Sequence, residues 1–231
     1  MSIARSLHLF EVATVRDNGV PVPVFLIGTA DGRWWLVDTG CPAGMIGDPA
    51  APFAVTAESH VVGRLDRLGL KPSDIDTVIV SHLDPDHAGA NDEFPHAEFV
   101  VQRAQHEHAT RSGLLRYEWM RPHWDLPDPR LVDGDTDLAP GVTLVECGGH
   151  TPGHQAVLVE LPETGRVLLA GDAWLRGSDP DTRPLSQHDL DGPKTRASQR
   201  KLMNLTDIAL VVHNHDAEQW RTLRRAPDRY T

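Results

Sequence analysis

The segment that decides the fold is His82-Leu83-Asp84-Pro85-Asp86-His87-Ala88-Gly89, residues 82–89. It directly follows residues 77–81, a short apolar stretch that predicts a buried strand. Two imidazoles and two carboxylates in so short a segment are the donors that Zn, Fe, Mn or Co accept at neutral pH. The segment therefore predicts a metal site at the carboxyl end of a strand.

Three further polar clusters also follow predicted strands. His150 comes after the strand expected at 142–147, Asp172 after the one at 166–170, and His215 after the one at 207–212. Side chains at strand ends can converge on one edge of a sheet, where binding sites commonly form. The candidate metal ligands are therefore His82, Asp84, Asp86, His87, His150, Asp172 and His215.

The charge balance narrows the classes of partner. The 231 residues include 22 basic and 33 acidic side chains, for a formal net charge of −11. This argues against a nucleic-acid surface, which needs clustered Lys and Arg, and against a polybasic membrane patch. Residues 1–14 lack a signal-peptide pattern, and no apolar run approaches the roughly 20 residues that span a bilayer. We expect one cytoplasmic domain over residues 1–231, with no nucleic-acid or membrane partner.

Histidine is abundant and cysteine is scarce, with 13 and 2 residues respectively. Cys41 and Cys147 are far apart and form no C-x-x-C motif, so we expect two buried thiols and no disulfide. A chain rich in His and Asp and poor in Cys favours metal bound by nitrogen and oxygen.

The remaining patterns predict strand clusters with helices between them. Strands are expected at residues 6–15, 23–29 and 34–38 as a meander, at 98–102, and as a hairpin at 155–161 and 166–170. Helices are expected at 58–68, 103–111, within 114–120 and at 194–204, and residues 174–193 are expected to form a loop or lid. This order predicts sheets covered by helices, an α/β fold in layers.

Taken together, the motifs resemble those of the metallo-β-lactamase superfamily. They are H-L-D-P-D-H-A-G at 82–89, G-H-T-P-G-H at 149–154, G-D-A at 171–173, N-H-D at 214–216 and V-D-T-G at 37–40. V-Q-R at 101–103 and H-D-A-E-Q at 215–219 make the chain most similar to the N-acyl-homoserine lactone lactonases. The resemblance covers nearly the whole chain and implies an αββα sandwich with the site at one edge of the sheets.

The resemblance also implies a reaction and a division of the ligands. One divalent metal ion would take His82, Asp84 and His150, and a second would take Asp86, His87 and His215, with Asp172 bridging the two. A metal-bound hydroxide would open a lactone or related ester, including quorum-sensing lactones, with Asp86 as the catalytic proton shuttle. The implied partner is a small lactone or ester, with a homodimer as one option for the assembly.

Two positions depart from the family pattern. The usual motif is H-x-H-x-D-H, and Asp84 stands where its second His would be. Zinc is the family's expected metal, and a carboxylate at this position favours iron or manganese. Many lactonases of this group place an oxyanion-donating Tyr three residues after the bridging Asp, where this chain has Leu175. Trp174 and Leu175 are therefore the candidate substrate-binding residues, and a different substrate orientation is expected.

Several alternatives stay open at this point. Asp84 precedes Pro85, a common helix start, so it is either a metal ligand or a helix cap. His213 competes with His215 as the last ligand, since alternation places both on the same side of an extended chain. Asp38 and His154 are expected to support the ligands from behind.

Two other functions compete with hydrolysis. The carboxylate at position 84 would also suit a non-haem iron oxidoreductase of the persulfide dioxygenase type. The two departures together would suit a relative that binds a ligand without catalysis.

Overall fold

Two β-sheets form the centre of the computed structural model, which describes residues 3–125, 128–177 and 185–231. The first sheet has the strand order β4-β1-β2-β3-β5-β6-β7, and the second has the order β12-β11-β10-β9-β8. The strands of the first sheet are β1 Ala4–Val15, β2 Pro21–Thr29, β3 Trp34–Val37, β4 Phe53–Ala54, β5 Ile75–Ile79, β6 Glu98–Gln102 and β7 Arg130–Val132. Those of the second are β8 Thr136–Ala139, β9 Val142–Glu146, β10 Gln155–Leu161, β11 Gly165–Leu169 and β12 Ile208–Val212.

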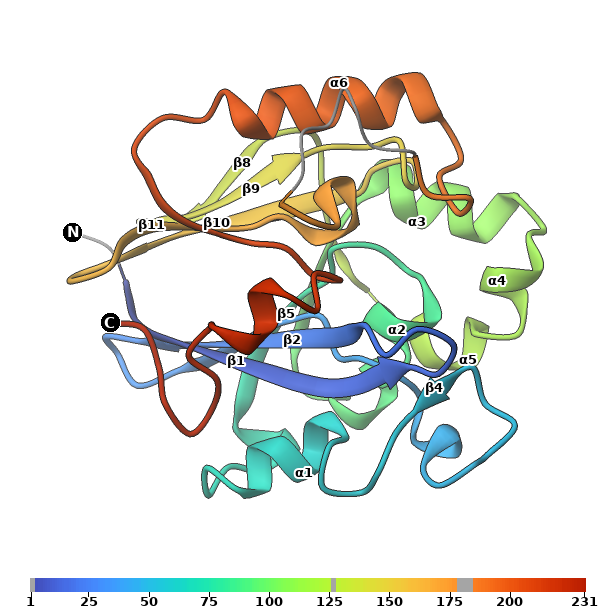
Figure 1. Cartoon of the computed structure of the whole chain (residues 1–231), viewed down its shortest axis with the longest axis horizontal. Coiled ribbons are helices and arrows are strands. Elements are labelled where there is room, and N and C mark those ends of the chain that lie inside the picture. Colours follow the sequence, from blue (N-terminus) through green and yellow to red (C-terminus); the bar gives the residue numbers. More distant parts are fainter. Residues whose placement is uncertain (1–2, 126–127, 178–184) are drawn as a thin grey trace.

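Helices cover the outer faces of both sheets. In Figure 1, α6 lies over the second sheet and α1 lies against the first, giving the layer order helix, sheet, sheet, helix. The α-helices are α1 Val61–Asp66, α2 Pro85–Ala88, α3 Arg103–Arg111, α4 Leu115–Glu118, α5 Arg121–Trp124 and α6 Gly192–Met203. Short 3₁₀ helices are η1 Ala43–Met45, η2 Pro72–Asp74, η3 Asn91–Glu93, η4 Gly171–Trp174 and η5 Gln219–Arg221. The predicted αββα fold class is confirmed.

Side chains that alternate between the two faces of each strand produce this layering. In β2, Phe25 and Ile27 belong to the core between the sheets, whereas Leu26 packs with the helices outside. In β10, Val157 faces the same central core, and Leu158 packs under α6. Because successive side chains of a strand point to opposite faces, a strand buried on both sides reads as a nearly continuous apolar run.

Most of the predicted elements are present with small shifts at their ends. The meander forms as antiparallel β1, β2 and β3, and β10 pairs with β11 as the expected hairpin. The sequence did not indicate β4, β7, β8 or α5, because elements of two to four residues are too short to show a period. The expected loop at 174–193 lies partly outside the described residues, and α6 already begins within it.

Gln155, the first residue of β10, joins the two sheets next to the polar strand ends. Its backbone N–H donates to the carbonyl of Ser81 at 3.0 Å, and its side-chain amide donates to the carbonyl of Val80 at 2.8 Å. Its side-chain oxygen accepts from Gln102 at 3.0 Å. The loops that follow β5 and β9 are therefore fixed relative to each other.

Two simpler expectations concern cysteine and the membrane. Cys41 and Cys147 are free and buried, as expected, and burial raises the pKa of both thiols. Within the described parts of the chain, no helix is long and apolar enough to cross a bilayer.

Candidate metal centre

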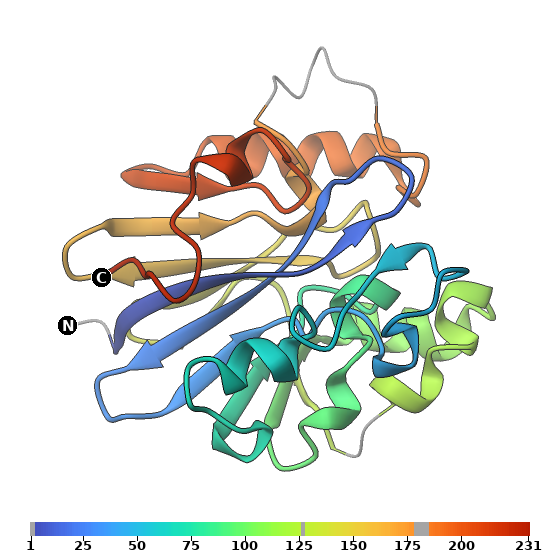
Figure 2. The ribbon, with the colours of Figure 1, turned by 60° about the horizontal axis from the view of Figure 1, so that its bottom comes forward.

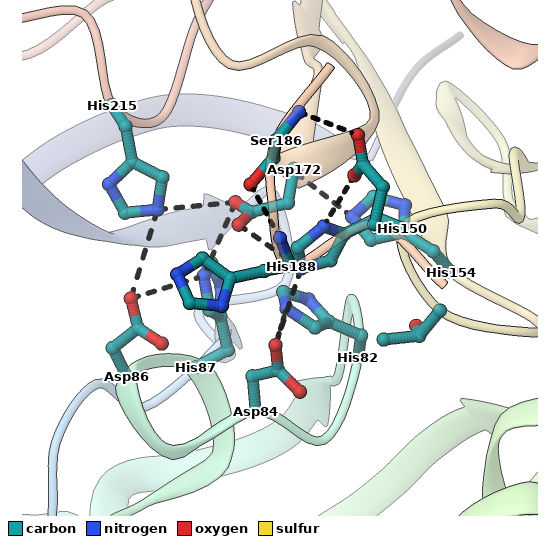
Figure 3. A network of polar contacts seen from close by, with 12 residues as sticks. His82, Asp84, Asp86, His87, His150, His154, Asp172, Ser186, His188 and His215 are labelled. Carbon is teal, nitrogen blue, oxygen red and sulfur yellow. Dashed lines mark hydrogen bonds and ion pairs between the residues drawn. The ribbon is translucent and has the colours of Figure 1, made fainter. Parts of the chain in front are cut away.

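All seven predicted ligands meet at one edge of the two sheets (Figure 3). The residues at 82–87 come from the loop after β5 and from α2, in the first sheet's half of the molecule. The other three follow strands of the second sheet: His150 after β9, Asp172 in η4 after β11, and His215 after β12. The site is thus built from both sheets, with four residues from the first half and three from the second.

The first group of donors is His82, Asp84 and His150, whose ligand atoms lie within 4.8 Å of one another. Asp84 Oδ2 lies 3.4 Å from His82 Nε2 and 3.2 Å from His150 Nε2. The three side chains are almost fully buried. The family resemblance implies this same set for one metal.

The second group is Asp86, His87 and His215, again with ligand atoms within 4.8 Å of one another. Asp86 Oδ2 lies 3.7 Å from His87 Nε2 and 3.8 Å from His215 Nε2. His215 and not His213 therefore belongs to the cluster. The ring of His213 instead contacts Trp174 at a centroid distance of 4.7 Å.

Asp172 lies between the two groups. Its Oδ1 is 3.3 Å from His87 Nε2 and 3.2 Å from His215 Nε2, and its Oδ2 is 3.5 Å from His150 Nε2. One carboxylate thus faces both sets of donors. This is the geometry that a bridging ligand requires.

The Nδ1 atom of each histidine in the cluster has a hydrogen-bond partner on the side away from the other donors. His87 Nδ1 donates to Asp38 Oδ2 at 2.8 Å, and His215 Nδ1 donates to the carbonyl of Pro21 at 2.7 Å. His150 Nδ1 donates to Asp189 Oδ1 at 2.9 Å. Because a carbonyl or carboxylate only accepts, these contacts assign the proton to Nδ1 and leave the Nε2 lone pair directed into the cluster.

The ring of His82 is oriented through Ser81. The Ser81 hydroxyl donates to Asp38 Oδ2 at 2.7 Å and lies 3.0 Å from His82 Nδ1, from which it accepts. Asp38 also accepts the backbone N–H of Ser81 at 2.7 Å. One buried carboxylate therefore holds both His82 of the loop after β5, through Ser81, and His87 of α2.

The donor set fits divalent metal. Among the described residues, His82 Nε2, His87 Nε2 and Asp172 Oδ1 are buried without a hydrogen-bond partner. Buried polar atoms are nearly always satisfied, so three such atoms pointing into one small space indicate a binding site for a ligand. Imidazole nitrogen and carboxylate oxygen suit zinc, iron and manganese.

The pKa shifts of the cluster also indicate a site for a positively charged ligand. Burial opposes ionisation of Asp172, but His215 and His87 outweigh it and hold the pKa of Asp172 well below its usual range. Burial likewise lowers the pKa of His87 and His215, but Asp172 and Asp86 overcome this effect and raise both. The acidic cluster therefore favours positive charge, which metal can supply in exchange for protons.

His154 supports Asp172 from behind. Its Nε2 accepts the backbone N–H of Asp172 at 2.9 Å, and its Nδ1 lies 3.2 Å from Cys147 Sγ. Burial lowers the pKa of His154 well below its ordinary range, so the ring is neutral.

Asp84 occupies the N-cap position of α2, yet its side chain makes no capping hydrogen bond. The carboxylate instead forms a two-point ion pair with Arg116 of α4, in which Nε donates to Oδ1 at 2.8 Å and Nη2 pairs with Oδ2. The backbone thus follows the cap interpretation, while the side chain faces His82 and His150.

An open cleft of about 1330 Å³ leads to the cluster. Its lining residues include Asp84, Asp86, Asp172 and His215 of the cluster, together with Leu175 and His188. The tip of the β1–β2 hairpin, which also lines it, extends in Figure 2 toward the segment that leads into α6.

Sequence reasoning missed Arg116, Asp189 and Ser81. Arg116 was placed on a helix without a role, and Asp189 lay in the expected loop. Both reach the cluster only through tertiary packing, across 32 and 39 residues respectively. Ser81 was assigned to the strand, and its hydroxyl carried no signal.

Comparisons with known proteins identify similar chains. Residues 17–229 match the model of the metallo-beta-lactamase superfamily. An N-acyl homoserine lactonase from Bacillus sp is 32% identical over 220 residues, covering 90% of this chain and 86% of that protein. The N-acyl homoserine lactonase AttM of Azorhizobium caulinodans is 32% identical over 238 residues, covering 93% and 89%. A solved N-acyl homoserine lactone hydrolase, with N-hexanoyl-L-homoserine bound at its catalytic metal center, has a TM-score of 0.85, 27% identity and full coverage of both chains.

Proposed function

The chain belongs to the metallo-β-lactamase superfamily, and from this premise we propose that it is a metal-dependent hydrolase that opens lactones or related esters. N-acyl homoserine lactones are the first substrate class to test, because similar proteins over nine-tenths of the chain are N-acyl homoserine lactonases. These relatives do not favour the iron oxidoreductase, nor a relative that only binds a ligand.

The observation that carries the proposal is the arrangement of donors around Asp172. Two groups of three donors lie on either side of one buried carboxylate. We assign His82, Asp84 and His150 to one divalent ion, and Asp86, His87 and His215 to the other. When bound, such paired ions supply Lewis acidity and lower the pKa of water.

The chain's own residues have distinct tasks in this reaction. Asp38, Asp189 and the carbonyl of Pro21 keep imidazole Nε2 atoms directed into the site. Asp86 is our candidate for moving a proton to the leaving alkoxide, since its side chain lines the cleft and is 14% exposed. Opening a lactone needs that transfer, because the leaving oxygen stays on the product.

Zinc, iron and manganese are the three candidate ions for the site. Zinc is the family's expected ion, and the carboxylate at position 84 supports iron or manganese. The deciding measurement is the metal content of the protein as isolated. It should be followed by reconstitution of metal-free protein with each ion in turn.

The activity test is a panel of acyl-homoserine lactones, simple lactones, esters and thioesters against the reconstituted protein. We expect ring opening, and we expect Asp172→Asn to lose both activity and metal. His96→Gln is the matched control, because His96 is exposed and lies outside the cluster. Protein that binds two metal ions yet opens no member of the panel would contradict the proposed function.

A further inference from the structure

The most unusual contact in the site is the ion pair between Asp84 and Arg116. Arg116 Nε donates to Asp84 Oδ1 at 2.8 Å, and Nη2 pairs with Oδ2. The Asp84 side chain is 8% exposed and that of Arg116 is 21% exposed. A largely buried, two-point pair of this kind is stronger and more specific than a surface salt bridge.

All three nitrogen atoms of the guanidinium have partners. Besides its two contacts with Asp84, Arg116 donates from Nη1 to the carbonyl of His188 at 3.2 Å. This third bond connects α4 to the loop that carries Asp189, the partner of His150. Arg116 is therefore held at the first group of donors, and its charge is committed to Asp84.

The contact involves the same oxygen that a metal ion would need. Asp84 Oδ2, which pairs with Arg116, is also the oxygen nearest to His82 Nε2 and His150 Nε2, at 3.4 and 3.2 Å. A cation held by these three donors would lie next to a fixed guanidinium. Like charges at such short separation repel strongly in a partly buried site.

The second group of donors has a different electrostatic environment. Its carboxylate, Asp86, has ion pairs with His87 and His215 and, among the described residues, with no Lys or Arg. The guanidinium of Arg116 is paired with Asp84 of the first group. The two groups therefore differ in the permanent positive charge next to their carboxylates.

We propose that Arg116 competes with metal for Asp84, so that the two metal positions fill unequally. The position formed by Asp86, His87 and His215 binds first and more tightly, and the position formed by His82, Asp84 and His150 is the weaker one. In the metal-free protein, Arg116 neutralises the charge of the buried Asp84 carboxylate. This inference rests on the proposed metal-dependent function and concerns the order of binding within it.

Stepwise metal affinity tests the inference directly. Metal-free protein is titrated with Zn²⁺ against a chromophoric chelator, which resolves a tight and a weak step. Arg116→Met removes the charge and keeps an unbranched side chain. We expect the weak step to tighten by about tenfold or more, equivalent to roughly 1.4 kcal/mol, while the tight step stays nearly constant.

Three further variants make the result specific. Arg121→Met removes the same charge from the neighbouring helix α5, where Arg121 pairs with Glu118 and Asp125, and should leave both steps unchanged. Arg116→Lys keeps the charge and should leave the weak step near its wild-type value. In an Asp84→Asn background, Arg116→Met should tighten the weak step less than it does in the wild type, because the contested carboxylate is gone.

The outcomes separate this inference from the proposed function. A weak step that loosens or stays constant in Arg116→Met overturns the inference, even if the wild-type protein binds two ions and opens lactones. Equal tightening of both steps also overturns it. If Arg116→Met does not fold, Arg116→Gln provides the same neutral test with a hydrogen-bonding side chain. Wild-type protein that binds no Zn²⁺ rejects both proposals.

Discussion

His154 accepts the backbone N–H of Asp172 through its Nε2 atom at 2.9 Å, and this bond fixes the residue that lies between the two groups of donors. The bond acts on the backbone and leaves both carboxylate oxygens of Asp172 free to face the histidines. His154 itself is completely buried and neutral. It therefore positions Asp172 without adding charge to the site.

Replacing His154 tests this positioning. Leucine fills the space but accepts no hydrogen bond, so His154→Leu should weaken metal binding by about 10- to 100-fold, the usual effect of losing a supporting contact. His154→Gln retains an acceptor and should recover part of the affinity. Metal content after dialysis against a weak chelator measures both. Equal metal content in the leucine variant and the wild type would contradict the prediction.

Asp38→Asn should also weaken metal binding, by about 10- to 100-fold, because an amide cannot accept as a carboxylate does from both His87 and Ser81. Asparagine tolerates the left-handed backbone of Asp38, whose φ is 63°, so the backbone stays unchanged. Asp207→Asn, at φ 58°, is the matched control away from the cluster. Chelator competition should separate the two variants, and similar affinities would refute the role assigned to Asp38.

Gly171→Ala should destabilise the fold more than Gly113→Ala. Both glycines have positive φ, 57° and 64°, so each substitution carries a similar backbone cost. A Cβ at Gly171 would lie 2.6 Å from the ring of His154, whereas a Cβ at Gly113 meets nothing within 4 Å. We expect the alanine at 171 to cost about 1–3 kcal/mol more in urea unfolding of metal-free protein. Equal losses would show that the loop simply moves aside.

Because His8 is buried, we expect the stability of the fold to fall in mild acid. Burial, with a smaller contribution from Arg229, lowers the pKa of His8 to about 4. The unfolded chain takes up a proton near pH 6.5, whereas the folded state resists it until about pH 4. The contribution of neutral His8 to the free energy of unfolding is therefore complete above pH 6.5 and is lost as the pH falls toward 4.

We expect His8→Leu to remove this loss. Between pH 7 and pH 4, the free energy of unfolding of the variant should rise relative to that of the wild type by up to about 3 kcal/mol. The free energy of unfolding is measured across that range with a chelator present, so that the metal-binding histidines contribute equally to both proteins. His96→Gln is the exposed control. A difference between His8→Leu and wild type that does not change with pH would contradict the prediction.

Leu175→Tyr tests the departure next to Asp172. Leu175 lines the cleft, and its carbonyl accepts the backbone N–H of His215 at 3.2 Å, so the backbone is already held at the site. A phenol there would offer a donor to the developing oxyanion, and we expect kcat for lactone opening to rise by about tenfold. Leu175→Phe adds the ring without the hydroxyl and should not. Equal rates for the two variants would reject an oxyanion role at this position.

Residues that are close together in the chain could be assigned to the site from the sequence, whereas residues brought there by tertiary packing could not. Clusters such as His82 to His87 could be predicted, because their donors are adjacent in the chain and follow a recognisable strand. The pairs Arg116 with Asp84 and Asp189 with His150 could not, because they depend on where short helices and loops pack. A single domain over residues 1–231 and the roles of the seven ligands stay predictions.

The division of the donors between the two sheets has a mechanical consequence. His82, Asp84, Asp86 and His87 belong to the first half of the chain, and His150, Asp172 and His215 to the second. Bound ions would therefore act as cross-links between halves that also meet through apolar packing and through hydrogen bonds such as those of Gln155 and His215. Chelation would loosen this seam first, so proteases should reach the strand-end loops of metal-free protein well before either sheet unfolds.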